Sequence, residues 1–422
     1  MRNNIPIGKI FFAFAFLFWF FLANRCTMRT SVKKKHKNLA YLYNPEEAFL
    51  HPQYLIYNNT EDSSILYVKI PYKDLLIREV AAQPSYAFVS VDAYLYASLV
   101  SGGLLDSFNL KKRLFVDSLD YAVFSIRIKT PNLKKTYLKI KLTDNFSEKS
   151  RDDYLEIDKT SIIHRQNFLL KDEKGDLLWN NVLKSKTHYR INSSLSSGLY
   201  VRMQNLFNQA AFVPYSSLAA PFIKYNPDTT FLLQEKEIFS DKEQMFFITH
   251  DTLRFRGIQY LILDSLFPKP HTPTQMLQPV SYLLSKAEFL SLQNERNPKY
   301  ALDRFWLKIA GSKRHAVEMI QVFYRRVTMA NRYFTSYKKG WQTDRGMIYI
   351  VFGTPTTVYK SATLERWIYG DANISNLVFD FSKSDALSYT NDYELVRGKN
   401  YQSSWSQAVS SWRGGKIFAI VR

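Results

Sequence analysis

The 422-residue chain contains only one cysteine, Cys26. A single cysteine excludes an intramolecular disulfide and a metal site built from several thiolates. The seven histidines are scattered, and none pairs with another at the i, i+4 spacing of a helical metal site. We therefore predict no cofactor, and we expect the fold to be stabilised by its hydrophobic cores alone.

Glycine and proline are also scarce, with 14 and 15 residues, whereas aromatic residues make up 16% of the chain. Tyr and Phe favour the half-buried surface of a β-sheet, so this composition predicts mainly β domains. A hydrophobic fraction of 46% with 22% charged residues is typical of a globular protein. The chain length predicts roughly three domains.

The common catalytic motifs are absent as well. The sequence has no G-x-S-x-G nucleophile elbow, no phosphate-binding P-loop and no dinucleotide-binding glycine pattern. The net charge of +20 suits an anionic membrane surface, an acidic polymer or nucleic acid. Because the basic residues are spread along the chain without a nucleic-acid-binding motif, we predict no nucleic-acid partner.

The N-terminus has the pattern of an export signal. Basic residues precede an apolar run at residues 10–23, which is shorter than the about 20 residues of a membrane-spanning helix. Cys26 follows closely, and residues 1–26 resemble a bacterial lipoprotein signal, in which the cysteine carries the lipid. Arg25 departs from the small residue that usually precedes that cysteine. The alternative is an uncleaved signal anchor, which the basic residues after the apolar run disfavour.

This pattern predicts a protein of the cell envelope that faces the periplasm and is anchored to the membrane through its N-terminus. Residues 27–48 are basic and polar. They are predicted to form a tether attracted to anionic lipid, or equally a solvated linker.

Residues 49–150 alternate between apolar and polar side chains. This alternation predicts an antiparallel, immunoglobulin-like β-sandwich, without the Cys-Trp-Cys core of true immunoglobulin domains. The expected strands are residues 65–70, 86–95, 121–128 and 136–142. Residues 151–267 predict a second β-sandwich-like domain, with strands at 167–170, 189–192, 200–204, 245–249 and 260–263. Clustered prolines then predict a Pro-rich linker at residues 268–279.

Residues 280–422 are predicted to form a helical segment followed by a small α+β module. Apolar residues recur at helical spacing in residues 281–293, 298–311 and 316–337. We expect Gly340 to end the third helix in a left-handed conformation and Gly346 to adopt a positive φ. The apolar run at residues 348–352 is expected to be a strand that ends at a Gly-Thr-Pro turn. Further strands are expected at residues 365–369, 376–381 and 393–397.

Residues 340–346 read Gly-Trp-Gln-Thr-Asp-Arg-Gly, and they resemble the signature motif of the GWxTD domain, a module of bacterial envelope proteins. Other segments that resemble this family are residues 305–306, 323–331, 348–355, 367–369 and 379–381, so the resemblance covers roughly residues 283–397. The resemblance implies an envelope location and β-rich partner domains. It implies no known activity.

The candidate functional residues surround this turn: Trp341, Thr343, Asp344, Arg345, Arg325 and Arg326. An aspartate among arginines could bind an anion or polarise a substrate. The same residues could instead fix the turn, because Arg–carboxylate hydrogen bonds are common structural devices. We favour the structural interpretation, since motifs that define a fold more often serve packing than chemistry.

Together these observations predict an exported, envelope-associated binding or scaffolding protein that carries a GWxTD domain. Its expected partners are the membrane, through the N-terminus, and an envelope protein or an acidic polymer. The alternative is an envelope enzyme, for example a hydrolase, with a site near the GWxTD turn.

Overall fold

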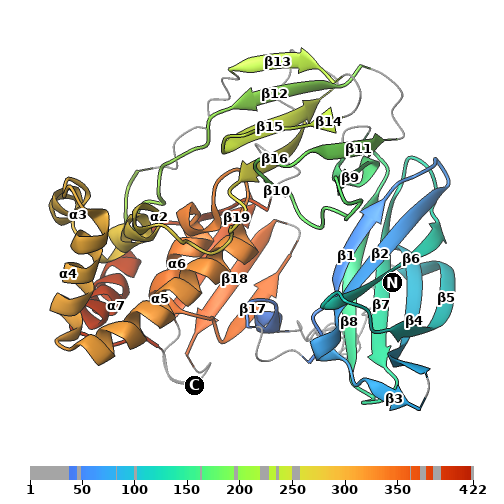
Figure 1. The fold of residues 1–422 in the computed structure, drawn as a ribbon, viewed down its shortest axis with the longest axis horizontal. Helices are drawn as coiled ribbons and strands as arrows, with labels where there is room; N and C mark the ends of the chain where they lie inside the picture. Colours follow the sequence, from blue (N-terminus) through green and yellow to red (C-terminus); the bar gives the residue numbers. More distant parts are fainter. Residues whose placement is uncertain are drawn as a thin grey trace, which may run out of the picture. The chain divides into compact units, whose positions relative to one another are not determined.

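The structure is a computed structural model that describes residues 38–44, 49–81, 83–98, 102–161, 164–193, 198–218, 228–233, 237–249, 257–361, 363–370, 377–383 and 391–419. The protein is mainly β, with several sheets and a helical segment (Figure 1). The predicted export segment, including Cys26, lies outside the described residues. Within the ranges above, no helix is long and apolar enough to cross a membrane.

The first β-rich region consists of two sheets that enclose one core. One sheet contains β1 (Gln53–Tyr57), β2 (Ser63–Pro71) and β6 (Tyr121–Lys129); the other contains β3 (Arg78–Val80), β4 (Gln83–Ser98), β5 (Gly102–Phe115), β7 (Lys135–Asp144) and β8 (Ser150–Asp158). Leu66, Val89 and Leu138 are among the fully buried side chains of this core. The expected strands at residues 65–70, 86–95, 121–128 and 136–142 are confirmed.

Four strands of this region were not predicted: β1, β3, β5 and β8. The two longer ones, β5 and β8, are rich in charged residues, and most side chains of β5 are exposed. Strand β5 is held by continuous antiparallel pairing with β4, and β8 by pairing with β7. Their backbone partners, rather than an apolar pattern of their own, make these segments strands.

The second β-rich region has the strands β9 (Phe168–Asp172), β10 (Val182–Lys184), β11 (Tyr189–Ser193), β12 (Tyr200–Gln204), β13 (Thr229–Leu232), β14 (Glu237–Ile238), β15 (Gln244–Thr249) and β16 (Ile258–Leu263). They form one sheet in the order β10-β16-β15-β12-β13 and a second in the order β14-β11-β9. All six side chains of β16 are buried. The five strands expected in this region are confirmed, within one to two residues at their ends.

The segment after β16 is helical, so the prediction of a plain Pro-rich linker at residues 268–279 is wrong. Helix α2 (Pro273–Leu277) and the 3₁₀ helix η4 (Gln278–Leu283) occupy most of it. Thr272 and Gln275 form a capping box, and Pro273 occupies the first helical position. Both features favour a helix start, and they outweigh the general tendency of proline to break structure.

Three longer helices follow: α3 (Lys286–Gln293), α4 (Pro298–Ala310) and α5 (Lys313–Phe334). Gly311 ends α4 in a left-handed conformation, with a φ of 70°. A final helix, α7 (Gln402–Arg413), was not predicted. Its Trp405 and Trp412 pack into the hydrophobic core that also contains buried residues of α4 and α5. Its apolar positions are widely spaced among serines, which hides the helical pattern in the sequence.

The run at residues 348–352 is part of a helix, α6 (Asp344–Phe352), and the prediction of a strand is wrong. All nine residues of α6 are buried. A helix that is buried on every side has a continuous apolar sequence, which periodicity cannot distinguish from a buried strand. Helices α5 and α6 lie side by side (Figure 1).

The sheet of the C-terminal region is antiparallel, in the order β17-β18-β19-β20. Its strands are β17 (Thr357–Lys360), β18 (Leu364–Tyr369), β19 (Leu377–Lys383) and β20 (Tyr393–Leu395). The combination of helices with a small antiparallel sheet agrees with the predicted α+β arrangement.

Gly340 and Gly346 have a different role from the predicted one. Helix α5 ends at Phe334, and Gly340 begins the 3₁₀ helix η5 (Gly340–Gln342). Neither glycine is among the residues of positive φ. A Cβ at Gly340 would overlap the carbonyl oxygen of Ala330, and one at Gly346 would overlap the carbonyl oxygen of Gly340. Glycine is needed here because backbone segments approach closely.

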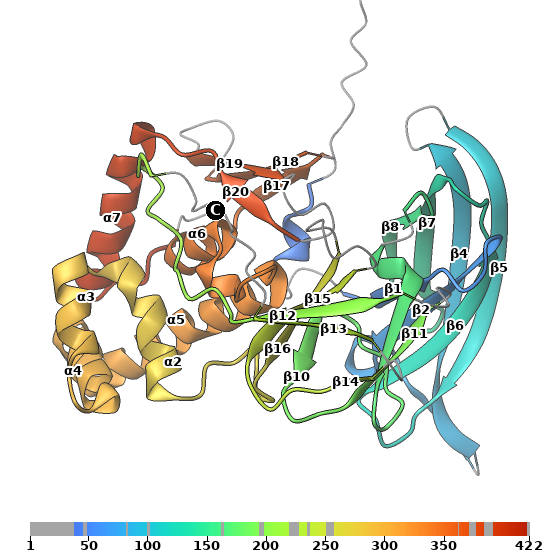
Figure 2. The same cartoon turned by 90° about the horizontal axis from the view of Figure 1, so that it is seen from above.

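Part of the predicted tether packs into the C-terminal region. Residues 38–44 include the 3₁₀ helix η1 (Ala40–Leu42), which lies beside β17 (Figure 2). The Leu39 N–H donates to the Val358 carbonyl at 2.8 Å. Tyr43 packs against the rings of Phe334 and Trp367, with centroid distances of 5.1 and 5.4 Å. This segment is therefore structural, and the prediction of a tether or solvated linker is wrong for residues 38–44.

Candidate functional site

The GWxTD turn connects η5 to the N-terminus of α6. The Trp341 N–H donates to Oδ1 of Asn331 at 3.0 Å, and the Trp341 carbonyl accepts from the Tyr282 hydroxyl at 2.7 Å. Thr343 is the N-cap of α6: its Oγ1 accepts from the Gly346 N–H at 3.0 Å. An N-cap threonine satisfies a backbone donor that the helix cannot pair. These contacts join the turn to α5, η4 and α6.

Asp344 is 6% exposed, and its carboxylate is fully engaged. Oδ2 accepts from the Leu395 N–H at 2.8 Å and from Nη1 of Arg397 at 3.0 Å, while Oδ1 accepts from Nη2 of Arg397. The carboxylate also lies in the first turn of α6, where the helix dipole stabilises negative charge. Asp344 thereby ties α6 to the end of β20.

Arg345 is 1% exposed and forms an ion pair with Glu365, which is fully buried. Its Nη1 donates to Oε2 of Glu365 at 3.0 Å, and its Nη2 donates to the carbonyl and to Oδ1 of Asn391. Glu365 also accepts from the Tyr43 hydroxyl at 2.6 Å and from Nε1 of Trp367 at 2.7 Å. The network connects α6, β18 and the N-terminal segment.

The electrostatics of Glu365 follow from this network. Burial raises the pKa of its carboxyl. The charges of Arg345 and Lys360, together with the two hydrogen bonds that Glu365 accepts from side chains of Tyr43 and Trp367, lower this pKa by more than burial raises it. The net pKa lies below the usual value, so the carboxylate is ionised at neutral pH. Burial and the same carboxylate raise the pKa of Tyr43 well above its ordinary value. Both groups are locked in the protonation states that their hydrogen bonds require.

Arg326, a residue of α5, lies at the C-terminal end of α6. It donates to the carbonyls of Ile350 and Val351 at 3.1 and 3.2 Å, and to that of Phe418 at 2.8 Å. The carbonyls of a last helical turn have no partners within the helix, and a cation there also complements the dipole. Arg325, the preceding residue, is exposed.

The structure thus brings together four of the six predicted site residues. Trp341, Thr343, Asp344 and Arg345 share one turn, whereas the two arginines of α5 lie apart from it. Their partners were not predicted as site residues: Tyr43, Asn331, Glu365, Asn391 and Arg397. Only Glu365 carries a signal, because it shares a strand face with the buried Trp367 and Tyr369.

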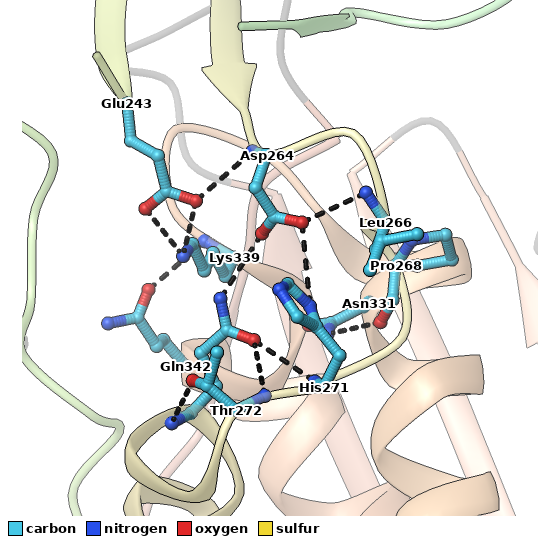
Figure 3. Close-up of polar contacts among 10 residues, drawn as sticks. Glu243, Asp264, Leu266, Pro268, His271, Thr272, Asn331, Lys339 and Gln342 are labelled. Carbon is cyan, nitrogen blue, oxygen red and sulfur yellow. Dashed lines mark hydrogen bonds and ion pairs between the residues drawn. The ribbon is translucent and has the colours of Figure 1, made fainter.

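A cavity of about 410 Å³ lies next to the turn, lined in part by Trp341, Gln342 and Lys339. Figure 3 shows the contacts that hold its walls. Lys339 Nζ lies 2.9 Å from a carboxylate oxygen of Glu243, and Asn331 Nδ2 donates to the Pro268 carbonyl at 2.9 Å (Figure 3). Both contacts connect α5 and η5 to the segments that flank β15 and β16.

A group of three or more His, Cys, Asp or Glu side chains suited to a metal ion does not occur in the described parts of the chain.

The sequence pattern of the GWxTD domain matches residues 244–414. This part of the chain is therefore a GWxTD domain. The match begins at Gln244 in β15, so the domain includes β15 and β16 in addition to the helices and the sheet of the C-terminal region.

Solved structures show only weak similarity. A Bacteroides uniformis β-glucuronidase is 13% identical, with a TM-score of 0.16, over 24% of this chain and 12% of that chain. A putative β-galactosidase from Bacteroides fragilis is 12% identical, with a TM-score of 0.16, over 35% of this chain and 19% of that chain. A red sea bream transglutaminase is 8% identical, with a TM-score of 0.19, over 53% of this chain and 33% of that chain. Scores this low carry no inference about function. Curated proteins give no match.

Proposed function

We propose that this GWxTD protein is an exported, envelope-associated binding or scaffolding protein, and that its GWxTD turn is a structural joint without catalytic activity. The observation that carries the proposal is the engagement of the motif's charges. Asp344 pairs with Arg397 and Arg345 with Glu365, and the four side chains are between 0% and 12% exposed.

A general acid or base must come within hydrogen-bond reach of its substrate. Asp344 and Glu365 already accept three hydrogen bonds or more each from the protein, so neither is available to a substrate. A hydrolase at this location would depend on the adjacent cavity. Among the described residues of its lining, Asp264 is the single carboxylate, whereas glycoside hydrolysis ordinarily needs two. The binding role therefore has the better support.

The β-rich regions are the proposed interaction modules. We propose that residues 49–150 adopt an immunoglobulin-like sandwich, supported by two sheets that share the core around Leu66 and Val89. Sandwiches of this kind present loops and sheet faces to partners. The net charge of +20 favours an acidic partner, either an envelope protein or an acidic polymer.

Membrane attachment is proposed to occur through a lipid on Cys26. The test is fractionation of cells that produce the full-length protein or its Cys26→Ala variant. We expect the wild-type protein in the membrane fraction and the variant released from it. An unchanged membrane fraction for the variant would contradict lipid attachment.

The binding role is tested by retention on full-length protein purified in detergent. Envelope extract is passed over the immobilised protein, and the retained component is identified by its mass before and after prolonged incubation. We expect specific retention of a component whose mass does not change. Conversion of that component into products would support the hydrolase alternative instead.

A further inference from the structure

Two adjoining cavities lie near the place where strands β10 and β16 meet the end of α5. One is the cavity of about 410 Å³ beside the GWxTD turn, and the other has a volume of about 520 Å³. Asp264, Phe267, Pro268 and Asn331 line both, so the cavities share a wall (Figure 3). Each volume lies within the range of small-molecule sites. Together the two cavities suit an extended ligand.

Two residues in the lining of the larger cavity carry a buried polar atom without a hydrogen-bond partner within the described residues. These atoms are Oε1 of Gln259 and Oγ of Ser336. The two side chains are 3% and 8% exposed. Nε2 of Gln259 donates to Sδ of Met245 at 2.7 Å, which leaves Oε1 as a hydrogen-bond acceptor. Because a buried polar atom without a partner is costly, the pair indicates a ligand that donates hydrogen bonds, as a hydroxyl group does.

The linings also contain three free cations. Lys184 and Arg332 line the larger cavity, and Lys269 lines the smaller one. All three side chains are exposed. None of them forms an ion pair or a side-chain hydrogen bond in the part of the chain that the structure describes. They are therefore available to an anionic ligand.

The other charges of the linings are already compensated. Lys339 pairs with Glu243 at 2.9 Å. Asp264, the single carboxylate among the described lining residues, accepts from the Leu266 N–H at 2.9 Å and from Nε2 of Gln275 at 3.2 Å. The cations thus outnumber the carboxylates, and an extended ligand with several anionic groups is favoured over a neutral or cationic one.

An acidic peptide would also combine anionic groups with hydrogen-bond donors. Peptides often bind by adding a strand to an open sheet edge, and the edge strand β10 lines the larger cavity. The N–H groups of Val182 and Lys184 in β10 already donate, to Oδ1 of Asn180 at 2.9 Å and to the Tyr189 hydroxyl at 2.8 Å. A peptide strand would find these donors occupied, whereas the hydroxyls of a saccharide need only side-chain partners.

We propose that the two cavities together bind an acidic oligosaccharide, a chain of sugars that carry carboxylates. Lys184, Lys269 and Arg332 bind the carboxylates, because ammonium and guanidinium groups form charge-assisted hydrogen bonds with them. Sugar hydroxyls donate to Oε1 of Gln259 and bind Oγ of Ser336. The inference rests on the proposed binding function and gives its acidic polymer a location on the molecule.

The test is isothermal titration of the full-length protein in a non-ionic detergent. Tetragalacturonate is the acidic probe, and its methyl ester keeps the hydroxyls of the chain but has no charge. Tripolyphosphate supplies charge without sugar hydroxyls, and tetraglutamate is the acidic peptide. We expect tetragalacturonate to bind most tightly, and the methyl ester about tenfold or more weakly. Added salt should weaken binding of tetragalacturonate, because it screens the exposed cations.

Substitution of the cations tests the charge contribution. Lys184→Gln and Arg332→Gln should each weaken tetragalacturonate binding about threefold, and the double variant more. Lys308→Gln is the matched control, because it removes an equal charge from an exposed position of α4 outside both linings. It should bind like the wild type.

Substitution of the buried acceptor tests the hydroxyl contribution. Gln259→Met removes Oε1 and should weaken tetragalacturonate binding about fivefold, while the affinity for tripolyphosphate stays unchanged. Ser336→Ala guards against a folding defect, because the Ser336 hydroxyl has no partner to lose within the described residues. It should also weaken binding of the acidic saccharide and leave tripolyphosphate unaffected.

Several results would overturn the proposal. They are absence of tetragalacturonate binding, equal affinity for its methyl ester, tighter binding of tetraglutamate or tripolyphosphate, and affinities that neither the cation variants nor the Gln259 and Ser336 variants change.

The same titrations separate this inference from the proposed function. Failure of tetragalacturonate binding, with an envelope component still retained by the immobilised protein, would reject the ligand class alone. Conversion of tetragalacturonate into shorter products would instead reject the non-catalytic function while leaving the binding site in place.

Discussion

At the scale of residues, the buried ion pair of Arg345 and Glu365 is the clearest case of charge used for structure. Both side chains are at most 1% exposed, and each has further hydrogen-bond partners. Buried pairs of this kind need not add net stability over apolar residues, but removal of one partner leaves the other charge buried without compensation. Substitution of either Arg345 or Glu365 alone should therefore destabilise the protein strongly.

We predict that Arg345→Met lowers the free energy of unfolding by about 3–5 kcal/mol, because it leaves Glu365 without its buried cation. Denaturant unfolding measures the change. The matched control is Arg366→Met, whose ion pair with Asp380 is exposed and should be worth less than about 1 kcal/mol. Equal losses for the two variants would contradict the structural role of Arg345.

Asp392 supplies a pH-dependent prediction. It is 3% exposed, and its Oδ2 has no hydrogen-bond partner among the described residues. Burial raises its pKa to about 6, although the nearby charge of Lys338 opposes the shift. The folded state thus binds the proton more tightly than the unfolded state does. The stability that protonation provides is present below the unfolded pKa of about 4 and is lost as the pH rises through about 6.

Asp392→Asn removes this penalty. We predict that the variant gains about 2 kcal/mol relative to the wild type when the pH is raised from about 4 to about 8. Urea unfolding of both proteins at the two pH values measures the difference. A gain that is the same at both pH values would show that ionisation of Asp392 does not affect stability.

The residues of the turn could be selected from the sequence, but their partners could not. Asp344 and Arg345 stand in a recognisable motif, whereas Glu365 lies 20 positions and Arg397 53 positions further along the chain. Charged residues are common in this sequence, and nothing local distinguishes these two except the inward strand position of Glu365. Pairing across such separations is decided by the fold.

At the scale of elements, the contact of α5 with the GWxTD turn depends on two positions, Gly340 and Gly346, at which there is no room for a side chain. The backbone of Gly340 lies against Ala330 of α5, and Gly346, in the first turn of α6, lies against Gly340. Helix propensity alone would favour alanine over glycine at position 346 by up to about 1 kcal/mol. The close backbone approach predicts instead that alanine at position 346 destabilises the protein.

We predict that Gly346→Ala destabilises the protein by more than about 2 kcal/mol, because the new methyl group forces α6 away from η5. Chemical denaturation measures the change. Gly311→Ala is the control: a Cβ there meets no atom within 4 Å, so only the left-handed backbone conformation is strained, at about 1 kcal/mol. A stabilised Gly346→Ala variant would contradict the packing described for the turn.

Two of the errors in the predicted elements, at α6 and β5, share one cause. Helix α6 and strand β5 both have sequences that their surroundings override: α6 is apolar on every side because it is buried, and β5 is polar because only its backbone is paired. Elements with one buried face, such as β4 and α5, were predicted correctly. Periodicity reports a single buried face and fails when both faces, or neither, are buried.

At the scale of the whole molecule, the described N-terminal segment is part of the GWxTD domain's core although it is distant in sequence. Tyr43 donates to Glu365, and its carbonyl accepts from the Tyr349 hydroxyl at 3.1 Å. Asn38 pairs with the backbone of β17 through two hydrogen bonds to Val358 and Thr356. The predicted export segment, residues 1–26, precedes this docked segment in the sequence.

We predict that a chain beginning at residue 38 unfolds at the same denaturant concentration as the full-length protein, whereas a chain beginning at residue 49 loses about 3 kcal/mol or more. The loss follows from exposure of the apolar surface that Tyr43 covers and from its lost hydrogen bonds. Equal stability of the two truncated chains would show that residues 38–44 do not contribute to the core.

We propose that the charges of the GWxTD turn hold the domain together rather than act on a substrate. A double-mutant cycle on Asp344 and Arg397 tests it most directly, with the free energies of unfolding of wild type, Asp344→Asn, Arg397→Met and the double variant. We expect a coupling free energy of about 2 kcal/mol or more, because each single change leaves a buried charge unpaired. Losses that add to within about 0.5 kcal/mol would contradict it.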